Sequence, residues 1–283
     1  MDAAVTDGDP LQNGVMKRTR VKKKQDTVAL INCCLSETLT PTTCTKVLKE
    51  IAKYIVCHKL IPYPYEALKN IASKHYNAVQ TADKAVHIQK KKAIQMKRHE
   101  KKMIDAYENF ENIFKNVELE LYNCITNGDE IEEVVLLLGA TVRSPHEVYR
   151  IIVPPMALKE PVHREGERIL LHLIRHIVMS EELNKILSHA MSPTNMYVML
   201  KKKEGKSSEW FLPNDAFNIP RCGRQASIYL SDLSQRKVKT ELPSMDTVKQ
   251  ESLSELLGNL HILPSNPRWF LSPISLKGFR LPR

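Results

Sequence analysis

The spacing of apolar residues changes near residue 127, and this change limits the fold class more than any other feature of the sequence. Between Met103 and Leu121 the large apolar residues recur at steps of three and four, which predicts a long amphipathic helix over about 85–126. Gly128 follows this stretch, and glycine tolerates the positive φ that commonly ends a helix. The stripe indicates a helix that lies flat on a core.

Two short apolar runs, residues 133–139 and 147–153, come after the helix. Residues typical of a turn separate them, so the runs predict two strands joined as a hairpin. Further helices are predicted at 42–60, 66–72 and 162–189, and further strands at 195–201, 209–212 and 226–231. This order predicts an α+β fold with helices on one face of a mainly antiparallel sheet.

The chain has 283 residues, which suits one domain with long flanks. Residues 1–40 are polar and lack a sustained period, so we expect a disordered basic N-terminal tail before a single domain at 41–283. Residues 232–266 are expected to form a flexible loop or insertion in that domain. No long uncharged apolar run or secretory start is present, so we expect a soluble intracellular protein with no membrane partner.

The positive charge is concentrated in two blocks. Residues 17–24 hold six basic groups and no acid, and residues 83–102 hold eight basic groups against Asp83 and Glu100. A nucleic-acid binder is expected to spread its charge over a folded face with interleaved aromatic residues. The blocks therefore disfavour a nucleic-acid partner and indicate a solvated tail and a solvated helix face. The block at 17–24 also fits a nuclear-import signal.

Motifs for catalysis, metal binding and cofactor binding are missing from the sequence. There is no glycine-rich phosphate loop, and the whole chain has only nine glycines. His172 and His176 have the spacing of a zinc-peptidase helix, but Leu173 stands where the catalytic glutamate would be. The six cysteines form no C-x-x-C pair. The sequence predicts a binding protein with no cofactor and no enzyme activity.

The predicted helix at 162–189 has an apolar arc that is wider than packing on one sheet requires. Its apolar residues span about 200° of the helix, whereas a stripe of somewhat more than about 100° is sufficient. The surplus lies on one flank, at Leu171, Ile174 and Val178, beside Arg175. Exposed apolar surface of this kind commonly marks a partner site. The alternative is that a loop or the chain's own tail covers it.

Four stretches of the sequence resemble the comet family of Mad-two-binding adaptors, which silence the spindle checkpoint. They are LIPYPYEAL at 60–68, LLLG with SPHEVY at 136–149, WFLP at 210–213 and WFLSPISLKGF at 269–279. They occur in the family's order and cover about 42–280, apart from the loop at 232–266.

The resemblance implies a HORMA-like fold, with three helices packed on the sheet and a C-terminal belt that docks back on it. The implied tail-docking residues are Trp269, Phe270, Lys277, Gly278 and Phe279.

The resemblance also implies a function without catalysis. The family recognises the closed conformer of the Mad-two protein and recruits a hexameric AAA+ ATPase, which then opens that conformer. The implied result is disassembly of the mitotic checkpoint complex and silencing of the checkpoint. We accordingly expect the protein in the nucleus and cytoplasm, and on the spindle in mitosis.

The contact residues implied by the family are assigned by position. The family's partner-facing aromatic residue on the third helix falls on Ile174, and a glutamine on the first helix falls on Cys57. The expected partner-binding residues are Ile174, Leu171, Val178, Arg175 and Cys57. The family's ATPase contact falls on Pro213 and Asn214, where asparagine replaces a basic residue. These departures leave the partner affinity, and the charged part of the ATPase contact, open.

Two other functions stay open at this point. The first is a basic nuclear chromatin or nucleic-acid-binding protein that uses residues 17–24 and 83–102; its DNA binding would weaken steeply with salt. The second is a HORMA peptide receptor that clasps a ligand with its own tail. Deletion of residues 267–283 separates these cases, because a receptor would lose peptide binding and an adaptor with a self-bound tail would lose stability.

Overall fold

The computed structural model describes residues 28–35, 38–81, 90–158, 163–220, 223–232 and 267–281. The expected loop, except for residue 232, and residues 1–27 of the expected tail lie outside the described residues. The helices in the described part are α1 (Pro41–Lys59), α2 (Tyr65–Thr81), α3 (Lys90–Thr126), α4 (His163–Met179) and α5 (Glu181–Leu187). The strands are β1 (Val28–Leu35), β2 (Ile131–Thr141), β3 (Ser144–Ile152), β4 (Asn195–Lys202), β5 (Leu212–Pro213), β6 (Arg224–Asp232), β7 (Arg268–Leu271) and β8 (Leu276–Lys277).

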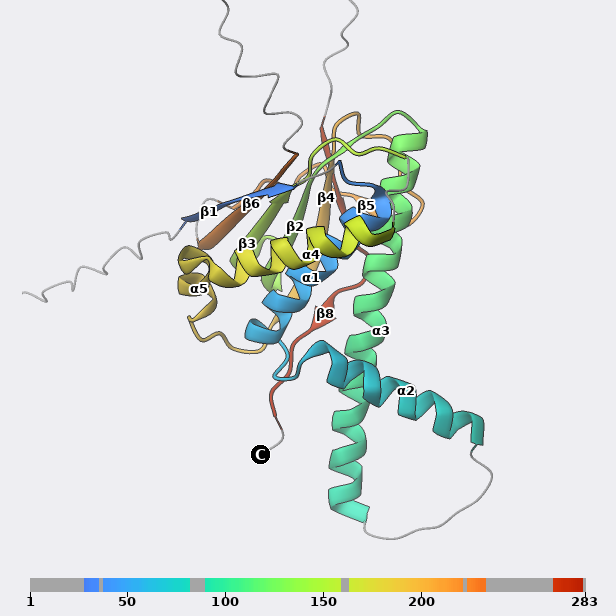
Figure 1. Cartoon of the computed structure of the whole chain (residues 1–283). Coiled ribbons are helices and arrows are strands. Elements are labelled where there is room, and N and C mark those ends of the chain that lie inside the picture. Colours follow the sequence, from blue (N-terminus) through green and yellow to red (C-terminus); the bar gives the residue numbers. More distant parts are fainter. Residues whose placement is uncertain are drawn as a thin grey trace, which may run out of the picture.

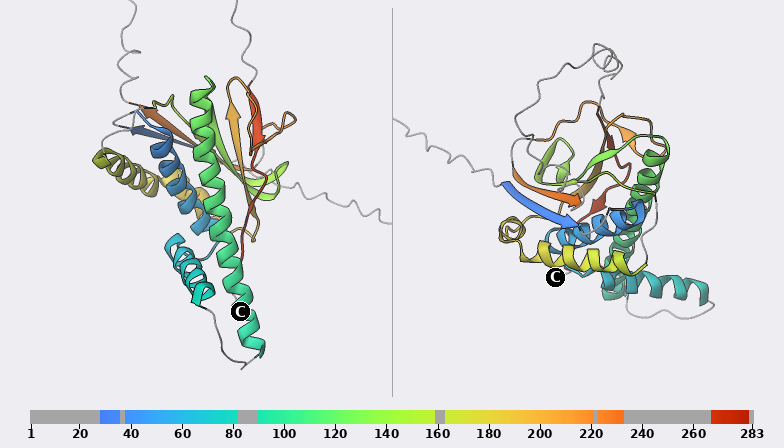
Figure 2. Two further views of the ribbon diagram at one scale, coloured as in Figure 1. Left: turned by 90° about the vertical axis from the view of Figure 1, so that its right-hand side faces the viewer. Right: turned by 45° about the horizontal axis from the view of Figure 1, so that its top comes forward.

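The architecture is α+β, as predicted, with a helical layer on one face of the sheet (Figures 1 and 2). The strand order is β1-β6-β3-β2-β4-β7-β5, and β8 also pairs with β4. The predicted hairpin is confirmed as the antiparallel pair β2–β3. The sheet is mixed, however, because β6 pairs in parallel with both β1 and β3.

The two faces of the sheet are covered differently. The main core lies between the sheet and the helices, and it includes Phe114 of α3 and Leu136 of β2. A smaller apolar cluster lies on the other face. There the Phe217 and Trp269 rings pack edge to face, with their centroids 5.1 Å apart. The described helices therefore leave this second face to loops and the tail.

Strand β1 corrects the prediction that residues 1–40 are disordered, since residues 28–35 form regular structure. Its buried positions alternate with more exposed ones, and Ala29 and Ile31 join the main core. Its partner in the sheet is β6, almost two hundred residues later in the chain. A strand of this length carries little local signal, and a pairing this distant is not visible in a local pattern.

The helix count of three is also corrected, because the described residues form five helices. The predicted helix at 162–189 is two helices, α4 and α5, separated at Ser180. The Ser180 hydroxyl accepts a hydrogen bond from the Leu183 N–H and so caps α5. The helix expected at 66–72 is longer, as α2, and the strand expected at 209–212 is only the short β5. No helix in the described ranges has the length and apolar character to cross a membrane.

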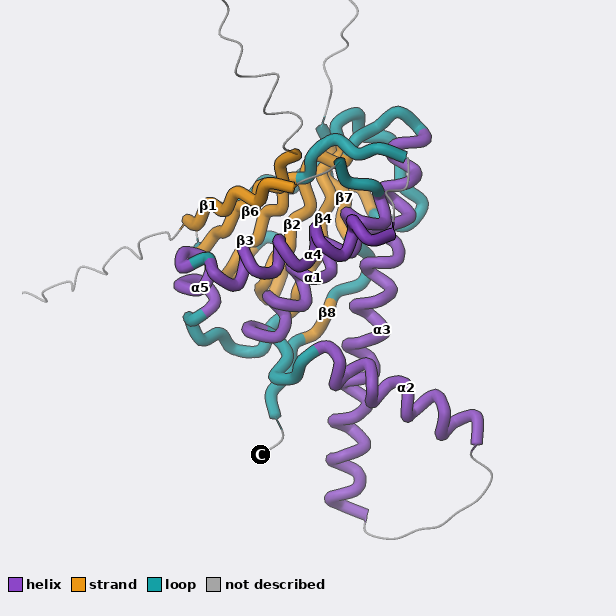
Figure 3. The backbone as a smooth tube through the Cα atoms, in the orientation of Figure 1, coloured by secondary structure: helices purple, strands orange, loops and turns teal. Residues whose placement is uncertain are grey.

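A projection of α2 and the first half of α3 extends from the body (Figures 1 and 3). The two helices are joined by side chains such as Tyr76, whose hydroxyl donates a 2.5 Å hydrogen bond to Glu108. At the base of the projection, the His99 ring packs edge to face on Phe279 of the tail.

Two buried ion pairs tie the helical layer to the sheet. Lys59 at the end of α1 donates to Glu147 of β3 at 2.8 Å, and both side chains are almost fully buried. Arg224 of β6 donates to the same carboxylate at 2.8 Å, and the Tyr149 hydroxyl donates to its other oxygen at 2.7 Å. Burial lowers the pKa of Lys59 and raises that of Tyr149. The second pair joins Lys202 of β4 to Glu120 of α3.

The C-terminal segment pairs with β4 through both β7 and β8. Phe270 is buried, and the Lys202 ammonium lies 4.7 Å from the centre of its ring. Gly278 N–H donates to the Thr194 carbonyl at 2.8 Å, and a Cβ at Gly278 would lie 2.7 Å from that same oxygen. Of the other expected tail-docking residues, Trp269 is half-buried, Phe279 is buried and Lys277 is exposed.

Candidate partner-binding surface

The exposed side of α4 carries the apolar residues that the helical wheel predicts there. Leu171, Ile174 and Val178 expose 68%, 37% and 42% of their surface. Leu173 and Ile177 on the opposite side are buried in the core, and Arg175 is exposed. The three side chains are exposed, as the helical wheel predicts, and no loop within the described ranges covers them.

Met179 extends this surface and was missed by the sequence analysis. It is the last residue of α4 and exposes 75% of its surface. It follows Leu171 and Arg175 at steps of four residues, so it lies on the same side of α4, and this spacing was visible in the sequence. The Ser180-Glu181-Glu182 sequence, which has the composition of a helix start, marks Met179 as the last residue of α4. We call Leu171, Ile174, Arg175, Val178 and Met179 the α4 flank.

The end of the α4 flank is held on α1 by one side chain of α5. Asn184 accepts a hydrogen bond from the Tyr54 hydroxyl at 3.0 Å, and its amide donates to the Val178 carbonyl at 2.8 Å. Asn184 thereby satisfies a carbonyl in the last turn of α4 that has no partner within that helix. Burial raises the pKa of Tyr54 above its ordinary value. The flank is thus presented on a fixed backbone.

Cys57 lies on the exposed side of α1, one turn beyond Tyr54. It lines a second cavity, of about 440 Å³, together with Met191, Pro193 and Leu281 of other segments. Its thiol is free. Cys57 is therefore on the surface, as the helical wheel predicts. It lies beside Leu281 of the C-terminal segment, although the sequence analysis grouped it with the partner-binding residues of α4.

Pro213 and Asn214 lie at the other end of the sheet. Pro213 belongs to β5, the last strand in the strand order, and is paired with Phe270 of β7. The Asn214 N–H donates to the Trp269 carbonyl at 2.7 Å. The strand that contacts α4 is β1, at the opposite end of that order. The two predicted contact regions are therefore separate surfaces.

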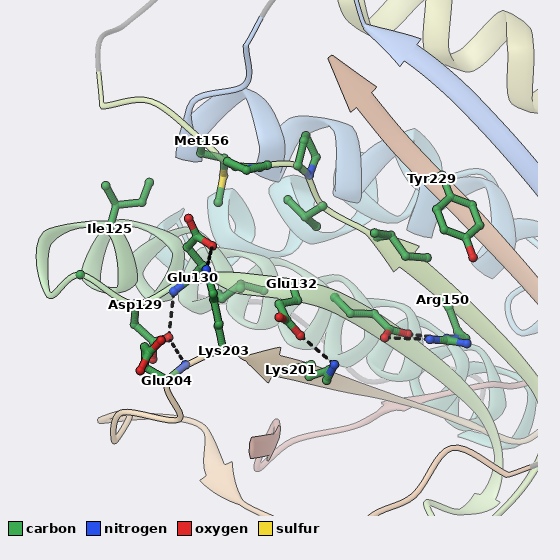
Figure 4. Close-up of a pocket in the computed structure, with 17 residues that line it drawn as sticks. Ile125, Asp129, Glu130, Glu132, Arg150, Met156, Lys201, Lys203, Glu204 and Tyr229 are labelled. Carbon is green, nitrogen blue, oxygen red and sulfur yellow. Dashed lines mark hydrogen bonds and ion pairs between the residues drawn. The ribbon is translucent and has the colours of Figure 1, made fainter. Parts of the chain in front are cut away.

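A cavity of about 690 Å³ lies where β2, β4 and the segment after β3 meet (Figure 4). Its basic side chains are each paired with a carboxylate: Arg150 with Glu133 at 2.5 Å, Lys201 with Glu132 at 2.7 Å and Lys203 with Glu130 at 3.1 Å. Asp129 accepts hydrogen bonds from the backbone N–H groups of Glu130 and Glu204, each at 2.8 Å. These contacts come from elements far apart in sequence, and the sequence analysis did not anticipate the cavity.

The two histidines with metal-like spacing do not form a metal centre in the part of the chain that is described. His176 Nδ1 lies 3.9 Å from Cys33 Sγ, and burial raises the pKa of this thiol to about 11. No group of three or more histidine, cysteine, aspartate or glutamate side chains in the described ranges is arranged to hold a metal ion.

This α+β domain exposes an apolar flank on an outer helix, and the charged side chains in the cavity of Figure 4 are paired with one another. Such a surface has the character of a protein-binding module. A family model described as "p31comet: Mad1 and Cdc20-bound-Mad2 binding" matches residues 17–244. The chain belongs to the p31comet family of spindle-checkpoint adaptors, which bind Mad2 complexes. This confirms the resemblance found in the sequence, although the match ends before the WFLSPISLKGF stretch. No curated protein matches the chain.

Proposed function

We propose that this protein is a non-enzymatic adaptor whose α4 flank binds the closed conformer of Mad2. The observation that carries the proposal is the exposure of Leu171, Ile174 and Val178 on a helix whose other side buries Leu173 and Ile177. Family membership gives the partner class. An apolar patch beside a single arginine is the composition expected at the centre of a protein interface, where charged residues other than arginine are depleted.

The fold that we propose for this adaptor is HORMA-like, with the C-terminal segment acting as a belt. The pairing of β7 and β8 with β4 supports this assignment, as does the close seat of Gly278. Because the chain's own tail occupies this edge of β4, the adaptor is favoured over a receptor that holds a separate peptide there.

The proposal extends to a second partner at the β5 edge, near Pro213 and Asn214. A AAA+ remodelling ATPase bound there would act on Mad2 held at the α4 flank, since the two surfaces are separate. The outcome would be disassembly of the mitotic checkpoint complex and silencing of the spindle checkpoint. Action in the nucleus, in the cytoplasm and on the mitotic spindle belongs to the same proposal.

The test is a pull-down of the full chain with Mad2 variants locked in the closed or the open conformer. We expect closed Mad2 to be retained and open Mad2 to be lost in the wash. Addition of the ATPase should give a ternary complex, and Asn214→Asp should weaken ATPase retention while Mad2 retention is unchanged. Equal retention of the two Mad2 conformers would contradict the proposed function.

A further inference from the structure

The projection formed by α2 and the first half of α3 carries a row of basic side chains that the proposed function does not use. Lys97, Arg98, Lys101 and Lys102 are all exposed. They form two pairs at a spacing of four residues, so they stand above one another on the helix. We call these four residues the basic stripe. Lys90, Lys91 and Lys92 belong to the first turn of the same helix.

The basic stripe faces away from the core of the protein. Met103 and Phe110, which follow it on α3, are buried on the opposite side of the helix, and Ala106, one turn beyond Lys102 on the near side, is also buried. Within the described part of the chain, the salt bridges involve other lysines and arginines, and none joins the stripe to a carboxylate. Burial, and after it the charge of Lys102, lowers the pKa of the neighbouring His99.

Two exposed carboxylates lie close to the stripe, Glu100 within it and Asp105 one turn beyond Lys101. Four basic groups against these two acids leave the stripe with a net positive charge.

The composition of the stripe favours a polyanion over a protein as its partner. Protein interfaces are depleted in lysine and enriched in aromatic side chains. The basic stripe has three lysines and one arginine. The aromatic ring among residues 97–102 is the imidazole of His99, which lies on the other side of the helix. Phosphate groups are well matched by lysine and arginine. Single-stranded nucleic acid would also require aromatic side chains for base stacking, so a duplex backbone fits better.

The sequence disfavoured a nucleic-acid partner because the positive charge forms two blocks and is not spread over a folded face with interleaved aromatic residues. The block at 83–102 was expected on a solvated helix face. In the structure, residues 97–102 lie on a helix that projects beyond the body (Figures 1 and 2). We propose that the basic stripe binds the phosphate backbone of duplex nucleic acid without sequence preference, at a surface separate from the α4 flank.

The experiment measures binding of the full chain to a fluorescent DNA duplex of arbitrary sequence, by anisotropy, over a series of NaCl concentrations. A variant with Lys97→Gln, Arg98→Gln, Lys101→Gln and Lys102→Gln removes the stripe. A protein that loses four phosphate contacts should show a slope of log K against log [salt] that is shallower by about 3 to 4. We also expect its affinity at low salt to fall by at least about tenfold.

The matched control removes four exposed basic residues elsewhere, with Lys46→Gln, Lys115→Gln, Arg143→Gln and Lys185→Gln. It has the same net charge as the stripe variant, so it should keep most of the wild-type slope. An equal loss in the two variants would show that only net charge matters and would overturn the proposal.

Two further outcomes would also overturn it. In the first, the stripe binds an acidic polyglutamate peptide but does not bind the DNA duplex. This result would indicate a protein partner. The other is complete loss of DNA binding when the basic residues of 17–24 alone are changed to glutamine. Retention of closed Mad2 by the stripe variant is measured in parallel, so that failure of this proposal is distinguished from failure of the proposed function.

Discussion

The variant Ile174→Asp is expected to lose binding to closed Mad2 by at least about 100-fold, which corresponds to about 3 kcal/mol, while its fold is retained. Ile174 belongs to the α4 flank and exposes 37% of its surface in the free protein. An aspartate there meets water in the free protein, but in the complex it would be an unpaired charge in an apolar interface. Titration calorimetry with closed-locked Mad2 measures the affinity, and urea unfolding measures the stability.

The matched control for this variant is Leu119→Asp. Leu119 is another exposed apolar residue on a helix, α3, and exposes 50% of its surface. It should leave Mad2 affinity within about threefold of wild type, since it lies outside the flank. If Ile174→Asp unfolds the protein, or binds Mad2 as Leu119→Asp does, then Ile174 does not belong to the interface.

The second large effect is expected for Glu147→Gln, which should reduce the free energy of unfolding by about 3–5 kcal/mol. The Glu147 carboxylate accepts from Lys59 and from Arg224, each at 2.8 Å, in a site with almost no exposure. Glutamine keeps the shape but removes the negative charge, so the buried Lys59 ammonium loses its counter-charge. Lys59 would keep only its bonds to the Ile186 and His189 carbonyls. Denaturant unfolding monitored by circular dichroism measures the loss.

The control for the buried pair is Glu132→Gln. Glu132 pairs with Lys201 at 2.7 Å, but both side chains are partly exposed. Exposed ion pairs contribute about 0–1 kcal/mol, so this variant should unfold within about 1 kcal/mol of wild type. If the two variants lose similar amounts of unfolding free energy, then burial does not explain the contribution of Glu147 to stability.

Local patterns were sufficient to predict the elements with strong periods. The hairpin of β2 and β3, the helix α1 and the body of α3 are present where the sequence placed them. The surplus apolar arc of α4 was also predictable, because it depends only on the spacing of residues in one helix. These features follow from residues within about twenty positions of one another.

The features that were missed depend on contacts between distant residues. Strand β1 needs β6 as its partner, and Lys59 meets Glu147 across 88 positions of the chain. The break between α4 and α5 is local, but the apolar residues on both sides of Ser180 concealed it. Met179 was overlooked although its four-residue step from Arg175 is local, and the charged cavity was missed because its pairs join β2 to β3 and β4.

Contact between the α4 flank and closed Mad2 can be measured by site-specific photo-crosslinking. A benzophenone amino acid at position 171 or 178 places the reactive group on the flank, and the same group at position 119 serves as the control. We expect crosslinks to closed-locked Mad2 from positions 171 and 178 and none from 119. Crosslinks from position 119 or the β5 edge, with none from α4, would contradict the account.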